Sequence, residues 1–253
     1  MVLDTVPRAR DQFSSKFNVP KYAANAYIKV RSNSNARCSR MARPWHLLLM
    51  GGTMYYGRMQ GELGPSSGGA DTRLTYNDLV LFPNDGMRHE IIDGEHYVTP
   101  SPIPRHQVLL GRLHFEIEYH LRQHPGIGRV FLSPLDVVFT QWDVVEPDLL
   151  FIARSQTDII GDKNIQGAPA LVVEILSPGT RNTDEQIKLR LFERGGVDEY
   201  WILDPDRDVV KVFSRQADGS LPLTAEWSRQ RSDTLTTPLI HGLAISLSEL
   251  FAS

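Results

Sequence analysis

Ala170-Leu-Val-Val-Glu-Ile-Leu176 is an apolar run that carries one charged residue, Glu174, near its centre. A run this apolar is typical of a central strand that is covered on both faces of its sheet. Burying a lone carboxylate in such a strand is costly unless the group is paired or bound to a metal ion. The run therefore predicts a core strand and marks Glu174 as a candidate site residue.

The segments that follow this run predict a crossover unit. A loop at Ser177–Thr180 leads to a helix over Thr183–Arg194, whose first turn is acidic and which Gly195-Gly196 closes. Glu199–Leu203 and Val209–Ser214 are expected to form a strand hairpin. The order of strand, helix and strand indicates a mixed sheet with a helix packed on it.

The segments before the run predict further elements of the same α/β domain. Asp148 follows Pro147 inside Val144–Ile152, which we interpret as one buried strand entered through a turn. Apolar residues recur on one helical face from His106 to His124. The remaining predicted elements are a capped helix from Thr75 that stops at Pro83, a hairpin over His89–Val98 that turns at Asp93-Gly94, and strands over Arg129–Leu132 and Leu135–Thr140.

Residues 1–70 differ from the rest of the chain in composition and charge. They hold ten Lys and Arg against three Asp and Glu, whereas residues 71–253 hold 17 against 27. No sustained hydrophobic period is present in them. A disordered basic arm, a targeting peptide, and upstream sequence translated from a misassigned start all fit this pattern, and the last is favoured. We therefore predict an N-terminal extension over 1–70 and one domain over 71–253.

Composition favours a soluble, cytoplasmic protein. The chain has 253 residues, of which 41% are hydrophobic, and a formal net charge of -3. Its single cysteine, Cys38, excludes an internal disulfide framework and a cysteine-based zinc site within one chain. No apolar stretch reaches the ~18 residues that a membrane span needs. The acidic balance of residues 71–253 argues mildly against nonspecific DNA binding.

Charged residues at the ends of the core strands suggest a divalent metal site. Asp148 and Glu174 stand on strands that we expect to be adjacent, and Mg²⁺ prefers hard oxygen ligands of this kind. Lys188, on the following helix, could orient an attacking water or stabilise charge on a phosphoryl group. Glu90, in the early hairpin, could supply a third carboxylate.

Structural interpretations of the same residues stay open. Glu174 could pair with Arg190 or Arg194, Asp148 could be a turn former, and Lys188 could be solvated. His106 is a candidate ligand or phosphate contact, with a capping or surface role as the alternative, and Tyr200 and Trp201 are expected to be core aromatics. The sequence contains no nucleophile elbow, H-E-x-x-H helix, Rossmann fingerprint or P-loop.

Five blocks of the sequence carry a family resemblance. They are His89-Glu-Ile-Ile-Asp-Gly-Glu95, Glu146-Pro-Asp148, Leu171-Val-Val-Glu-Ile-Leu-Ser-Pro178, Lys188, and Val197-Asp-Glu-Tyr-Trp-Ile-Leu-Asp-Pro205. In this order they resemble the Uma-two (Uma2) family of bacterial restriction-endonuclease-like proteins, formerly classed as a domain of unknown function. That family is placed in the PD-(D/E)xK nuclease superfamily. The resemblance extends over about residues 74–252.

The resemblance implies a restriction-endonuclease-like fold, a central mixed sheet flanked by helices, and a Mg²⁺ or Mn²⁺ site. It assigns Asp148 and Glu174 to the motif carboxylates and Glu90 to the early acidic position. The lysine expected two residues after Glu174 is absent, since position 176 is Leu, and Lys188 matches the lysine that the family carries on the following helix. His89 stands where the family often has Tyr.

Our leading hypothesis is therefore a Mg²⁺-dependent endonuclease that hydrolyses phosphodiester bonds in DNA. Asp148, Glu174 and Glu90 would hold the metal, and Lys188 would position the water. The alternatives are a non-catalytic nucleic-acid-binding or interaction domain that keeps the nuclease fold, and RNA as the substrate. A homodimer would suit duplex cleavage, because each strand needs an active site, and no membrane partner is expected.

Overall fold

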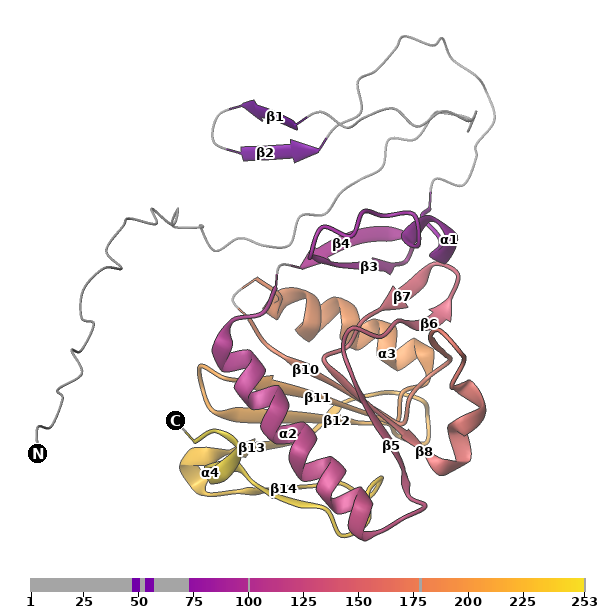
Figure 1. Cartoon of the computed structure of the whole chain (residues 1–253). Helices are drawn as coiled ribbons and strands as arrows, with labels where there is room; N and C mark the ends of the chain where they lie inside the picture. The colour runs from indigo at the N-terminus through magenta and orange to yellow at the C-terminus, as the bar shows by residue number, and fades with distance from the viewer. Residues whose placement is uncertain (1–46, 51–52, 57–72, 100, 178, 253) are drawn as a thin grey trace, which may run out of the picture.

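The structure of the chain is a computed structural model that describes residues 47–50, 53–56, 73–99, 101–177 and 179–252 (Figure 1). Most of the predicted extension over 1–70 lies outside these ranges. Within it, β1 (Leu47–Met50) and β2 (Thr53–Tyr56) pair as an antiparallel hairpin. The boundary near residue 70 stays a prediction.

A six-stranded sheet contains the run that decides the fold. Its order is β13-β12-β11-β10-β8-β5, and β10 (Leu171–Ile175) lies in its interior. β10 pairs antiparallel with β8 and parallel with β11, so the sheet is mixed as predicted. The other strands are β5 (Gly128–Leu132), β8 (Leu149–Ala153), β11 (Glu199–Asp204), β12 (Val209–Ser214) and β13 (Leu223–Ser228).

The predicted crossover from β10 to β11 is present, with one difference inside its helix. Its first half, η2 (Thr183–Lys188), is a π-helix, and only α3 (Leu189–Gly195) is α-helical. Gly196 ends α3 with φ of 94°, a left-handed conformation that glycine adopts at little cost. In a π-helix each N–H bonds five residues back, which changes the residues that face the core. Asp184 and Lys188, which are four residues apart, are both buried.

A second sheet lies beside the first and has the order β4-β3-β7-β6-β9. The prediction of one strand over Val144–Ile152 is wrong, because β7 belongs to this second sheet and β8 to the first. Pro147 lies between them, where its ring removes a backbone donor from the ladder. The strands are β3 (Arg88–Ile92), β4 (Glu95–Thr99), β6 (Val137–Thr140), β7 (Asp143–Val145) and β9 (Ile165–Gln166).

The predicted hairpin and helices near the start of the domain are confirmed. β3 and β4 turn at Asp93 and Gly94, which have φ of 54° and 76°. α1 (Tyr76–Leu79) follows Thr75, whose backbone N–H donates to Asp78. The other elements are α2 (Pro104–Gln123), η1 (Arg154–Ile159), η3 (Arg229–Arg231), β14 (Thr234–Thr236), β15 (Ala244–Ser246) and α4 (Leu247–Leu250).

The two faces of the six-stranded sheet are covered differently. α2 lies across one face (Figure 1). Its buried leucines belong to one core cluster with side chains of that face such as Val173 and Trp201. α3 and the second sheet cover the other face, on which Val172 packs with Phe192. Of the helices in the described part of the chain, none combines the length and apolar character needed to traverse a bilayer.

Candidate active site

Strand alternation directs Glu174 to the face covered by α3. Val173 and Ile175 belong to the core under α2, whereas Val172 and Leu176 belong to the core under α3. Successive side chains of a strand point to opposite faces, so Glu174 shares the face of Val172. It is 2% exposed and lies at the position where η2 and the second sheet meet the strand.

Lys188 lies between two of the predicted carboxylates. Its Nζ donates to Glu90 Oε1 and to Glu174 Oε1, each at 2.8 Å. Asp184 Oδ1 lies 3.7 Å from the same nitrogen. The lysine side chain is 1% exposed. The interpretation of Lys188 as a solvated surface residue is therefore wrong, and so is the pairing of Glu174 with an arginine in place of this lysine.

Asp148 is held by three donors at the start of β8. Its Oδ1 accepts from Arg88 Nη2 at 2.9 Å. Its Oδ2 lies 2.9 Å from His106 Nε2 and accepts from the backbone N–H of Ile175 at 2.8 Å. Because Leu149 pairs with Val173, Asp148 stands beside Glu174 one residue further along the ladder. The two acids predicted to share an ion are thus brought together.

The environments of these two acids shift their pKa values in opposite directions. Burial alone would raise the pKa of Asp148, but the hydrogen bond from His106 and the charge of Arg88 lower it well below its ordinary value. Burial raises the pKa of Glu174 well above its ordinary value, although Lys188 opposes the shift, because nearby Asp148 and Asp184 add to it. Neighbouring carboxyl groups with pKa values pushed apart are typical of a functional site.

Three functional candidates were not found from the sequence. Asp184 is 2% exposed, and burial raises its pKa to about 6 against the opposing effects of Lys188 and Thr180. Glu146 lies at the edge of the cluster, where burial and the neighbouring Asp136 raise its pKa to about 7. Arg88 is the third. Arg88 stands two residues before Glu90 on the same strand, and alternate residues of a strand point to one face. The sequence could therefore have indicated that Arg88 lies beside Glu90.

The cluster has oxygen atoms suited to a divalent cation. Within the described residues, Glu90 Oε2 and Asp184 Oδ1 are buried without a hydrogen-bond donor. A buried carboxylate oxygen that lacks a donor is costly, and binding a cation would relieve that cost. The donor chemistry of Asp148, Glu174 and Glu90 fits Mg²⁺ or Mn²⁺, which prefer carboxylate oxygen.

The carboxylates are not arranged as a ready metal site. Across the ranges that the structure describes, no three His, Cys, Asp or Glu side chains converge as they would around an ion. Lys188 instead holds Glu90 and Glu174, and Arg88 holds Asp148. The assignment of Asp148, Glu174 and Glu90 as metal ligands therefore stays a prediction.

The aromatic residues and the histidine that the sequence analysis singled out are all buried. Tyr200 and Trp201 are fully buried core aromatics, as expected. His106 is neither a surface residue nor a cap, because it is 6% exposed and contacts Asp148. The Thr180 hydroxyl accepts from the backbone N–H of Ser177 and closes the loop after β10.

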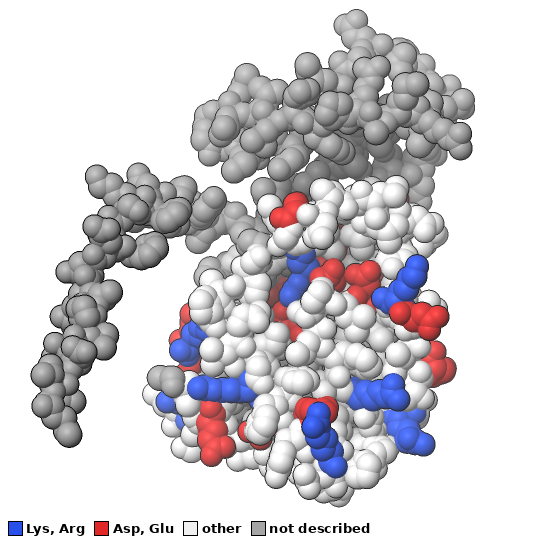
Figure 2. All heavy atoms as spheres, viewed as in Figure 1, with Lys and Arg blue, Asp and Glu red and all other residues white. Residues whose placement is uncertain are grey.

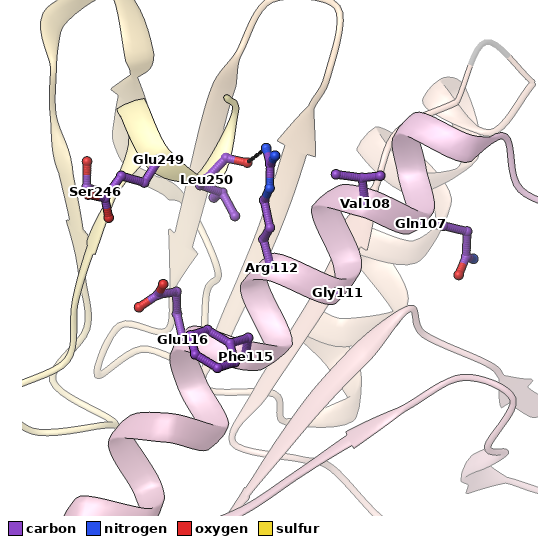
Figure 3. Close-up of a pocket in the computed structure, with 9 residues that line it drawn as sticks. All are labelled: Gln107, Val108, Gly111, Arg112, Phe115, Glu116, Ser246, Glu249 and Leu250. Carbon is purple, nitrogen blue, oxygen red and sulfur yellow. Dashed lines mark hydrogen bonds between the residues drawn. The ribbon is translucent and has the colours of Figure 1, made fainter. Parts of the chain in front are cut away.

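Two surface hollows lie away from this cluster. One, of about 430 Å³, runs between α2 and the C-terminal segment and is lined by residues such as Phe115 and Glu249 (Figure 3). In it Arg112 Nη1 donates to the carbonyl of Leu250 at 3.2 Å (Figure 3). The other, of about 390 Å³, lies between the end of α2 and β5. Neither is lined by Asp148, Glu174 or Lys188.

Basic and acidic side chains are interspersed on the face of the molecule that Figure 2 shows. Blue and red groups alternate over the described surface and do not form a broad field of one sign. Phosphate backbones are attracted to continuous basic surfaces. This face therefore resembles an ordinary mixed surface.

Comparison with known proteins places this geometry in a family. The profile of the Uma2 family, described as "Putative restriction endonuclease", matches residues 75–248. A crystal structure described as "a putative nuclease" from Anabaena variabilis superimposes with a TM-score of 0.60 and 22% identity, covering 71% of this chain and 98% of that one. No curated protein matches the chain.

The structural match confirms the predicted restriction-endonuclease-like fold, and the family description supports a nuclease-like function. The matched region includes every residue of the cluster around Lys188. The chain therefore belongs to the Uma2 family.

Proposed function

We propose that this protein is a metal-dependent endonuclease that hydrolyses phosphodiester bonds in DNA. The observation that supports the proposal best is the contact of Lys188 with Glu90 and Glu174 beside Asp148, inside an otherwise apolar core. Burying this many charges costs stability, and a chain that needed only a core would fill the same space with apolar side chains. Function is the simplest reason to keep them.

Asp148 and Glu174 would hold the ion, with Glu90 as an accessory ligand. When bound, a Mg²⁺ or Mn²⁺ ion would polarise the phosphoryl oxygen and lower the pKa of a coordinated water. The lowered pKa of Asp148 keeps this carboxylate ionised at neutral pH. Ile175 and His106 fix its orientation through hydrogen bonds.

Lys188 would orient the attacking water and stabilise the negative charge that develops on the phosphate. Its amine donates to two carboxylates, and a positive charge at this position suits electrostatic stabilisation of the transition state. Its position on η2 is set by packing in the crossover, so the group is preorganised and does not depend on a loop.

The test is a cleavage assay on supercoiled and linear duplex DNA, single-stranded DNA and RNA, each with Mg²⁺, Mn²⁺ or EDTA. We expect cleavage of DNA that requires the ion. Asp148→Asn and Glu174→Gln should each reduce the rate by about 10³-fold, because each removes a charged ligand while keeping the shape of the side chain.

Glu199→Gln is the matched control. Glu199 is also a buried carboxylate on a core strand, but it faces the α2 side of the sheet and bonds to Trp201 and Thr237. Its variant should cleave within about threefold of the parent rate, a difference of less than about 0.7 kcal/mol. Full activity in both site variants would show that Asp148 and Glu174 are not needed for cleavage. Preferential cleavage of RNA would show that the substrate is RNA and not DNA.

A non-catalytic nucleic-acid-binding or interaction domain is the second candidate. The burial of the cluster favours it, because Asp148, Glu174 and Lys188 are each no more than 2% exposed. Thermal unfolding with increasing Mn²⁺ separates the two candidates. A working site gains stability with ion concentration, and the gain should vanish in Glu174→Gln, whereas a scaffold should show no gain at all.

A further inference from the structure

We infer that Arg88 is a phosphate-binding residue whose guanidinium is released to the substrate when a divalent ion takes its place on Asp148. The inference rests on the proposed function. It begins from the fact that Arg88 Nη2 bonds to Asp148 Oδ1 at 2.9 Å, on an oxygen that metal binding would use. A guanidinium and an ion compete for the same carboxylate lone pairs.

The position of Arg88 distinguishes it from the other basic group of the cluster. The Arg88 side chain is 17% exposed, whereas that of Lys188 is 1% exposed. Arg88 Nη2 also contacts Ser133 Oγ at 3.2 Å, and its Nε lies 3.9 Å from Glu146, whose side chain is 20% exposed. The Arg88 side chain therefore lies between the buried carboxylates and the solvent, on the side from which a nucleic acid would approach.

The charges around Arg88 explain why it stays on Asp148 before an ion binds. Its Nη2 lies 2.9 Å from Asp148 Oδ1 and its Nε lies 3.9 Å from Glu146 Oε2, so two carboxylates attract the guanidinium. A divalent cation among the same carboxylates would repel the guanidinium. The planar group could then form paired hydrogen bonds to a phosphate, a geometry for which arginine is better suited than lysine.

The first test measures metal affinity by calorimetric titration of Mn²⁺ into the full chain, with no nucleic acid present. Removing the competitor in Arg88→Met should tighten Mn²⁺ binding about tenfold or more, because a charge-assisted hydrogen bond to Asp148 no longer opposes the ion. Arg88→Lys keeps the positive charge but loses the planar guanidinium, so it should increase the Mn²⁺ affinity by a smaller factor. It replaces Arg88→Met in the test if the Met variant fails to fold.

Arg105→Met is the matched control. Arg105 bonds to Asp208 and to the carbonyl of Pro205, outside the cluster. Its variant should bind Mn²⁺ as the parent does. An affinity for Mn²⁺ in Arg88→Met and Arg88→Lys equal to or below that of the parent would overturn the competition between the guanidinium and the ion.

The second test measures binding of a short duplex with and without Mn²⁺ at several salt concentrations, checking on a gel that the duplex stays intact. The ion's own contact with phosphate is common to parent and variant. Releasing Arg88 adds one further phosphate contact, so Mn²⁺ should steepen the slope of log affinity against log salt by about 0.9 more in the parent than in Arg88→Met. An equal response in parent and variant would overturn the phosphate role.

The outcomes separate this inference from the proposed function. If no variant and no parent binds Mn²⁺, the metal dependence of the proposed nuclease fails and the release of Arg88 fails with it. If the parent binds Mn²⁺ and cleaves DNA while Arg88→Met matches it in both tests, only the role of Arg88 is lost.

Discussion

Glu174 and Glu199 are buried carboxylates on adjacent parallel strands, yet their surroundings differ. Glu199 Oε2 accepts from Trp201 Nε1 and Thr237 Oγ1, both at 2.9 Å, and both donors are neutral. Glu174 bonds to the Lys188 ammonium in a group that contains three further acids. Burial raises the pKa of both glutamates. A raised pKa therefore does not distinguish a structural acid from a candidate catalytic one.

The distinguishing property is the balance of charge on each face of the sheet. On the α3 face, four acids meet two basic side chains, Arg88 and Lys188. The excess of negative charge is met in part by raised pKa values, as for Asp184 and Glu174. On the α2 face, the hydrogen bonds of Glu199 involve no ionised partner. A cation has a reason to bind on the first face and none on the second.

The comparison is tested most strongly by Lys188→Met. The change leaves Glu90 and Glu174 buried without a positive partner, so we expect the free energy of unfolding at pH 7 to fall by about 3–5 kcal/mol. Urea unfolding measures this. The loss should be smaller at pH 5, where the carboxyl groups can be protonated. A loss below about 1 kcal/mol would mean that the ammonium does not compensate these acids.

The pH dependence of the free energy of unfolding should reflect the buried acids on the α3 face. Burial raises the pKa of Asp184 from 3.8 to about 6, so the folded chain binds a proton that the unfolded chain lacks between these values. Stability should therefore fall by about 1–3 kcal/mol as pH rises from 4 to 7. Asp184→Asn should flatten this decline in urea unfolding measured across the range.

Asp148 should change the free energy of unfolding with pH in the opposite direction, and at lower pH. Its lowered pKa means that the unfolded chain binds a proton first, so its contribution is present above pH 4 and is lost as pH falls further. Asp206→Asn is the control for both windows, because the Asp206 side chain is 71% exposed. A decline between pH 4 and 7 that is unchanged in Asp184→Asn would contradict the raised pKa.

Glu199→Gln should have the smallest effect. The amide oxygen can still accept from Trp201 and Thr237, and no ion pair is broken. We expect a change in the free energy of unfolding of less than about 1.5 kcal/mol at pH 7. An effect as large as that of Lys188→Met would show that the two faces do not differ in the way described.

Much of the fold and the main site could be predicted from the sequence, because period and turn signals are local. The β3–β4 hairpin, α2, β10 and the crossover to β11 follow from alternation, helical spacing and Asp93-Gly94. The separation of β7 from β8 did not follow, because both segments are apolar and only Pro147 divides them. Sheet membership depends on long-range pairing, which a local pattern does not contain.

Within the site, Asp148, Glu174 and Lys188 were predicted and are adjacent, whereas Asp184 was not. In the sequence Asp184 has the position of a helix N-terminal acid, which normally faces solvent. Asp184 stands four residues before Lys188, so helical spacing places the two on one face, and the expectation that Lys188 faces the sheet already carried a signal for Asp184. Alternation places Arg88 on the face of Glu90, but that pattern does not indicate its partner Asp148, which lies 60 residues away in the sequence.

The most direct test of the metal site is a crystal soaked in Mn²⁺ and measured at the manganese absorption edge. The account predicts an anomalous peak within about 2.5 Å of carboxylate oxygens of both Asp148 and Glu174, with Arg88 no longer on Asp148. A fully soaked crystal with no peak at these residues, in which Lys188 and Arg88 keep their present partners, would contradict it.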